Sequence, residues 1–114
     1  MTPYEMAKIV HRELSPVAPK LSAALNRALI DIGEGSVLVG LGKGMHEDDF
    51  VSFQEFEHID VQGNDPANIL AKIAGVIGKL EEHSSWKVLI DRKSGSGPHT
   101  LELLYTIYRS KTML

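Results

Sequence analysis

Histidine and carboxylate side chains gather in the middle of the sequence, where they would suit metal or acid-base chemistry. The set is His46, Glu47, Asp49, His58 and Asp60. Imidazole and carboxylate groups bind divalent metals and activate water, so a divalent-metal hydrolase would result if the chain brought these residues together. Asp60 falls on the same strand face as His58, but the spacing of the two histidines matches no helical His pair. We therefore expect surface histidines, assign no metal or cofactor, and keep the hydrolase as a remote alternative.

Three further segments resemble ligand-binding or catalytic loops only in part. Glycines at positions 40, 42 and 44 flank Lys43, but no Ser or Thr follows the lysine, and the GxxxxGK[ST] spacing of a phosphate loop is absent. An EF-hand register that ends at Glu55 puts Gly44 and His46 at ligand positions where calcium needs oxygen atoms. Residues 94–99 offer hydroxyl groups and an imidazole without the spacing of a nucleophile elbow. We predict connecting loops at the first and third of these segments, interpret the EF-hand register as a chance resemblance, and assign no catalytic residue.

The charges of the chain are unevenly distributed along the sequence. No Lys or Arg lies between Lys43 and Lys72, whereas seven of the fifteen acids do. These acids are Glu47, Asp48, Asp49, Glu55, Glu57, Asp60 and Asp65. The segment thus carries a formal charge of −7, while the twelve bases and eight acids elsewhere give +4. If the segment forms one edge of a sheet, its charges converge on one surface, and a basic partner would relieve their repulsion.

Length and composition describe one globular domain, which we assign to residues 1–114. A chain of 114 residues with 43% hydrophobic and 24% charged residues has neither a disordered composition nor the length for two cores. The absence of Cys excludes a disulfide framework, a zinc finger and cysteine catalysis. A net charge of −3 argues against nucleic-acid binding. Without a signal peptide or a stretch of the ~20 apolar residues that span a bilayer, we expect a cytoplasmic protein with no membrane contact.

Three segments carry the signals of helices. A capping box at residues 2–5, with proline at the first helical position, predicts a short helix to about residue 13. A Ser-Pro pair at residues 15 and 16 predicts a second helix, whose apolar residues keep the helical period until Gly33. Asp65 and Pro66 predict the start of a third, in which apolar residues recur at helical spacing to Leu80. The last of these is the expected core helix.

The remaining segments favour strands. Residues 36–41 form a short β-branched run, and residues 50–61 favour a strand with a bulge or turn where the alternation breaks at residues 55–58. Residues 86–93 and 101–108 alternate and should pair as a hairpin, whereas we expect residues 109–114 to fray. The order ααββαββ predicts a two-layer α+β sandwich, in which about three helices pack on one face of a four-stranded, mainly antiparallel sheet.

The charge segregation favours a non-enzymatic module that binds a basic protein partner through an acidic face. The predicted binding residues are Glu47, Asp48, Asp49, Phe50, Phe53, Glu55, Glu57 and Asp60. In this hypothesis the carboxylates steer and position the partner, while a buried aromatic side chain anchors it. An inhibitor of a nuclease, such as an immunity protein that neutralises a bacterial or phage toxin, has this physical character, because an acidic surface can occupy a groove meant for phosphates.

A structural or assembly subunit is the alternative hypothesis. Such a virion component, secretion-apparatus component or chaperone would form a homo-oligomer through its sheet edges. The predicted last strand supports this hypothesis, because it carries apolar or aromatic residues on both faces, including Leu104 and Tyr108. Light scattering separates the two hypotheses, since only the assembly subunit gains mass with concentration.

Overall fold

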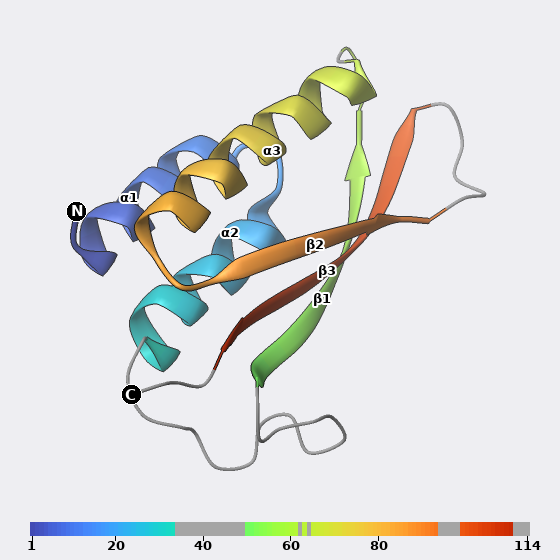
Figure 1. The fold of residues 1–114 in the computed structure, drawn as a ribbon. Helices are drawn as coiled ribbons and strands as arrows, with labels where there is room; N and C mark the ends of the chain where they lie inside the picture. Colours follow the sequence, from blue (N-terminus) through green and yellow to red (C-terminus); the bar gives the residue numbers. More distant parts are fainter. Residues whose placement is uncertain (34–49, 62, 64, 94–98, 111–114) are drawn as a thin grey trace.

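Helices cover one face of an antiparallel sheet (Figure 1). The structure is a computed structural model, and it describes residues 1–33, 50–61, 63, 65–93 and 99–110. Its elements are α1 (Pro3–Leu14), α2 (Pro19–Asn26), the π-helix η1 (Arg27–Ile32), β1 (Phe50–Asp60), α3 (Pro66–His83), β2 (Lys87–Arg92) and β3 (Thr100–Ser110). The predicted α+β class is confirmed. The described strands form a three-stranded sheet in the order β1-β3-β2, and the fourth strand predicted at residues 36–41 lies outside the described residues.

Helix α1 begins with the predicted capping box. The Thr2 hydroxyl accepts a hydrogen bond from the Glu5 N–H at 3.1 Å, and the Glu5 carboxylate accepts one from the Thr2 N–H at 2.7 Å. The hydrogen bond from the Thr2 backbone lowers the pKa of Glu5, because it stabilises the ionised carboxylate. Met6, Val10 and Leu14 then bury one side of α1 against the core.

The second helix differs from its prediction at its start and in the form of its last turns. Ser15 ends α1 as its C-cap, and α2 begins three residues after the Ser-Pro pair, at Pro19. The residue before it is Ala18, which has no side-chain oxygen for the first amides of the helix, so the partner of these amides comes from elsewhere in the chain. From Arg27 the helix continues as the six-residue η1. The predicted end at Gly33 is confirmed, with a φ of 72° that favours glycine.

Strands β1 and β3 pair over their full length. The register runs without interruption from Phe50 opposite Ser110 to Asp60 opposite Thr100. The prediction of a bulge or turn at residues 55–58 is therefore wrong. The break in the alternation of apolar and polar residues has another cause. Glu57 occupies a position that faces the helices, where regular alternation would place an apolar residue, and it is buried there. Arg109, which we expected in a frayed end, is also buried and lies within β3.

The third helix and the C-terminal hairpin follow their predictions. The Asp65 carboxylate accepts the Ala67 N–H at 3.1 Å and caps α3, whose buried side is formed by Ile69, Ile73, Val76, Ile77 and Leu80. Strand β2 pairs with β3 in antiparallel register, with Val88 opposite Ile107. These local signals were sufficient because the residues that carry them lie within one helix or one hairpin.

Two arginines and two aromatic rings join η1 to the sheet. The Arg27 guanidinium lies 5.1 Å from the centre of the Phe53 ring, which meets the Trp86 ring edge-on at 6.3 Å. The Arg109 guanidinium lies 5.4 Å from the centre of the Trp86 ring, and its Nε donates to the Gly33 carbonyl at 2.9 Å. Cation–π and edge-on aromatic contacts are both attractive, so this stack fixes the end of η1 to the sheet.

Candidate protein-binding surface

Strand β1 divides the predicted binding residues between two faces of the sheet. Phe50 and Asp60 lie on the face turned away from the helices, whereas Phe53, Glu55 and Glu57 lie on the covered face. The other three predicted residues, Glu47, Asp48 and Asp49, lie outside the described residues. The structure therefore does not gather the described members of this set on one accessible surface.

Glu57 is engaged inside the protein. Its side chain is 2% exposed, and its carboxylate accepts hydrogen bonds from the Lys20 N–H at 2.9 Å and from the Leu21 N–H at 3.2 Å. The buried Tyr105 hydroxyl donates to the same carboxylate at 2.7 Å. Glu57 thus caps α2 from a neighbouring strand, in the place of the side-chain oxygen that Ala18 lacks. This carboxylate positions the helical layer on the sheet.

The Tyr105 hydroxyl gives this network a measurable pH dependence. Burial raises the pKa of Tyr105, and the hydrogen bond to Glu57 and the charges of Glu57 and Glu55 raise it further. The unfolded chain releases this proton near pH ~10, whereas the folded protein retains it. Above about pH 10 the free energy of unfolding should therefore fall, by up to about 1.4 kcal/mol per pH unit from this group.

Substitution of Tyr105 by Phe tests this pH dependence. Urea unfolding of both proteins between about pH 8 and about pH 11 should show the variant as the less stable one at the lower pH, because it lacks the hydrogen bond to Glu57. The two curves should converge at the higher pH, since only the wild-type loses the contribution of Tyr105. Parallel curves over this range would contradict the assignment, because the two proteins differ only at residue 105.

An apolar patch lies on the face of the sheet that the helices leave uncovered. We call this patch the open sheet face and define it by Phe50, Phe56, Leu89, Leu104 and Tyr108. The first three are 41%, 43% and 59% exposed, and Leu104 and Tyr108 are half-buried. Phe50 meets Tyr108 edge-on at 6.0 Å, and Phe56 lies opposite Leu104 in the register. A group of exposed apolar side chains on one face of a monomer is typical of a protein-binding site.

Charged side chains border the open sheet face. The two ring nitrogens of His58 each lie 3.3 Å from a carboxylate oxygen, one of Asp60 and one of Glu102. The predicted placement of His58 and Asp60 on one strand face is thus confirmed. Asp91 pairs with Lys93 at 3.4 Å, and Lys87 lies opposite Tyr108. The end of the patch around His58 therefore carries two carboxylates for one imidazole.

The candidate chemistry of the sequence falls mostly outside the described residues. His46, Glu47 and Asp49 do so, as do the glycine-rich segment that contains Lys43 and the loop at residues 94–98. Within the described ranges, no group of three or more His, Asp or Glu side chains is arranged to hold a metal ion. His58, Asp60 and Glu102 form an exposed hydrogen-bonded row instead.

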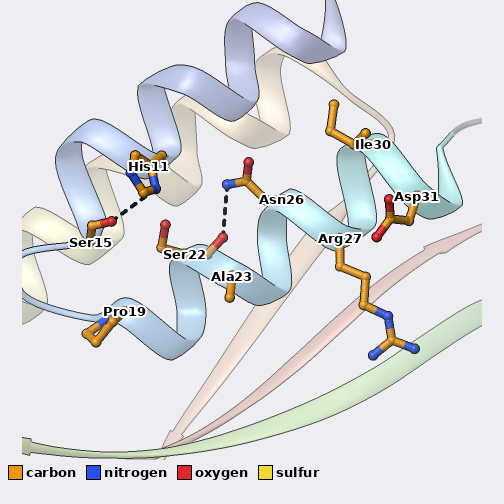
Figure 2. A pocket seen from close by; sticks show the side chains of 9 residues that line it. All are labelled: His11, Ser15, Pro19, Ser22, Ala23, Asn26, Arg27, Ile30 and Asp31. Carbon is orange, nitrogen blue, oxygen red and sulfur yellow. Dashed lines mark hydrogen bonds between the residues drawn. The ribbon is translucent and has the colours of Figure 1, made fainter.

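Two features of the surface were missed by sequence reasoning. Leu89 was treated as part of an ordinary alternating strand, although it falls on the face of Lys87 and Asp91, where an apolar residue is the exception. The second feature is a pocket of about 520 Å³ in the helical layer, which His11, Ser15 and Asn26 help to line (Figure 2). No sequence motif marks this pocket, because its walls come from separate helices.

Comparisons with known proteins provide no relative for this chain. No family model, no curated protein and no solved structure matches it. Among the helices of the described residues, none is both long and apolar enough to cross a membrane.

Proposed function

We propose that this protein is a non-enzymatic binding module that contacts a basic protein through its open sheet face. The observation that carries the proposal is the exposure of Phe56 and Leu89, together with Phe50, on the side of the sheet that no described helix covers. Aromatic side chains at the centre of an interface provide most of its binding energy when a partner excludes water from them. Phe56 is the natural anchor, because it is exposed and lies next to Leu104 on β3.

The charge of the proposed partner follows from the carboxylates around this patch. Asp60 and Glu102 lie at one end of the open sheet face. At its other end, Phe50 is joined directly to the acidic run Glu47 to Asp49, which the sequence places next to it. A partner with Lys or Arg side chains around an apolar patch complements this arrangement.

Within this proposal, a nuclease-type toxin is the class of partner that we infer. Such an enzyme has a basic groove shaped for phosphates, and an inhibitor that presents carboxylates gains fast, salt-sensitive association with that groove. The expected behaviour is that of an immunity or inhibitor protein, which binds one enzyme in equimolar amount.

The anchor is tested by capture of the partner from lysate of the source organism at low salt. The wild-type bait should retain one basic protein in equimolar amount and release it in a salt gradient. A bait with Phe56→Ser and Leu89→Ser should not retain it, since both side chains are exposed and their loss leaves the core intact. Retention of the same protein by this variant would contradict the proposed surface, whereas recovery of the bait alone, in multimers, would favour self-assembly.

The carboxylates are tested separately by the association rate of the captured complex. Replacing Glu47, Asp48 and Asp49 by Ala should slow association at low salt by about tenfold and flatten its salt dependence, because steering depends on the summed charge. The dissociation rate should change less. Stopped-flow mixing over a range of salt concentrations measures both quantities.

The matched control removes the same number of charges from the helical layer. Its substitutions to Ala are at Glu13, Asp31 and Glu82. This variant should associate nearly as fast as the wild-type, because its charges are removed from the helical layer, which covers the opposite face of the sheet. Steering by the acidic run would be contradicted if the variant at residues 47–49 associated as fast as the wild-type. It would also be contradicted if this variant and the control lost association rate equally.

A homo-oligomeric assembly subunit is the second candidate function. Leu104 and Tyr108 favour it, because their half-buried side chains on the open sheet face would be covered equally well by a second copy. In that case light scattering should show mass that rises with concentration in the wild-type and not in the variant with Phe56→Ser and Leu89→Ser.

A further inference from the structure

The helical layer contains a groove between α1 and the α2–η1 segment. Two pockets of about 520 Å³ and about 600 Å³ adjoin there, with His11, Asn26 and Ile30 lining both. Along α1 the lining extends from Tyr4 to Ser15, a wall about 16 Å long at 1.5 Å per residue. We call these two adjoining pockets together the helical groove. It shares no residue with the open sheet face.

The part of the groove near the start of α1 is apolar at its base. Ala7 is buried there, Tyr4 is 67% exposed and Ile30 is 37% exposed. Asn26 on α2 lies between the two walls. Its amide donates to the Ala7 carbonyl on α1 and to the Ser22 carbonyl on α2, and the first of these hydrogen bonds links the two walls. Ile30 lies in η1, and short π-helical segments are frequent at functional sites because they displace side chains from regular helical positions.

The charged groups around this part of the groove are basic. Lys8, His11 and Arg12 line the larger pocket, and none of its lining residues is an acid. On α1 the neighbouring carboxylates belong to Glu5, which is held by the Thr2 cap, and to Glu13, which pairs with Arg12 at 3.2 Å.

The far part of the groove has a different charge. It contains Asp31, together with the hydroxyl of Ser15, which contacts the His11 ring at 3.1 Å. Arg27 points away from His11 toward the sheet, where its guanidinium lies over Phe53 (Figure 2). Positive charge is therefore concentrated near Lys8 and Arg12, over the apolar base.

We propose that the helical groove binds an acidic amphipathic helix of a partner protein. An elongated groove between two helices accepts a third helix, whose apolar residues at positions i, i+3, i+4 and i+7 pack between the walls. Its apolar side would cover Tyr4 and Ile30, and its Asp or Glu side chains would meet Lys8 and Arg12. The protein would then carry two independent binding surfaces, one on each layer, and could join two partners.

A phage-displayed library of random peptides about 15 residues long, selected on the wild-type protein, tests this proposal even while the partner is unidentified. The selected peptides should be enriched in Asp and Glu beside apolar residues at helical spacing. Their dissociation constants should rise at least tenfold with Lys8→Gln and Arg12→Gln together, and at least tenfold with Ile30→Ser. The matched control, Lys72→Gln with Lys79→Gln on α3, should leave them unchanged, as should Phe56→Ser.

Four results would overturn the proposal. The first is selection of only neutral or basic peptides, and the second is binding that persists in the Lys8→Gln and Arg12→Gln variant. The third is a mass that doubles with concentration in sedimentation and returns to the monomer in that variant, since a second copy would then fill the groove. Loss of peptide binding with Phe56→Ser alone would also overturn it, because it would place the peptides on the open sheet face. The lysate capture described above is unaffected by any of these results, so the two proposals can fail separately.

Discussion

Replacing Glu57 by Ala should lower the free energy of unfolding by about 3–5 kcal/mol, since buried donors left without an acceptor cost about 1–3 kcal/mol each. The substitution leaves three such donors, the N–H groups of Lys20 and Leu21 and the hydroxyl of Tyr105. It also removes the cap of α2 and opens a small cavity between the helix and β1. Urea unfolding followed by circular dichroism measures the change.

Two further substitutions show whether the effect comes from this network. Glu55→Ala, on the same strand and only half-buried, should cost less than about 1 kcal/mol, as expected of a position with few buried contacts. Glu57→Gln should fall between the two, because its amide oxygen accepts while its NH₂ group faces donors. A double-mutant cycle of Glu57→Gln with Tyr105→Phe should show coupling, since the two side chains share a hydrogen bond. A loss for Glu57→Ala no larger than that for Glu55→Ala would contradict the capping role.

Glu57 also shows why part of the binding surface could not be predicted from the sequence. Its type and its place in a run of acids indicate a solvated face, and its position in the strand indicates the core. The conflict is resolved only by the amides of Lys20 and Leu21, which lie more than thirty residues earlier in the chain. Long-range hydrogen bonds leave no local pattern, so the sequence suggested a bulge where the structure has a buried carboxylate.

The elements that were predicted correctly are those whose signals are local. The capping box of Thr2 and Glu5 and the cap of Asp65 lie within the helices they start, and the apolar residues of α3 reveal its buried side by their spacing alone. The start of α2 was misplaced, because Ser15 and Pro16 match a start signal while the actual cap is on β1. Local chemistry thus predicts where an element can begin, and tertiary contacts decide where it does.

The open sheet face was partly visible in the sequence. Phe50, Leu104 and Tyr108 were recognised as candidates for contact with a partner or a second copy, but Phe53 was grouped with Phe50, although an odd spacing along a strand places the two on opposite faces. Leu89 could have been found by the same rule, since it interrupts the polar side of β2. Alternation along a strand separates its two faces, but it does not indicate which of them the helices cover.

The largest effect expected outside the Glu57 network is that of Trp86→Ala, which should lower the free energy of unfolding by about 3–5 kcal/mol through the cavity it leaves. Trp86 is fully buried, and its ring contacts Phe53 and the Arg109 guanidinium. Its loss removes an aromatic pair and a cation–π contact in addition to buried apolar area. Unfolding should be followed by circular dichroism, because Trp86 is the only Trp in the sequence and the variant has no intrinsic indole signal.

Trp86→Phe separates the ring contacts from the indole N–H. Among the described residues the Trp86 Nε1 has no hydrogen-bond partner, so its removal relieves an unsatisfied donor while the smaller ring keeps part of the contact with Phe53. The loss should therefore be only about 1–2 kcal/mol, well below that of Trp86→Ala. A loss for Trp86→Phe as large as that for Trp86→Ala would show that the indole N–H has a partner and that the packing of the ring contributes little. A clearly smaller loss for Trp86→Phe would show that ring packing is the main contribution of Trp86. The stack formed by Arg27, Phe53, Trp86 and Arg109 then holds η1, and with it one wall of the helical groove, against the sheet.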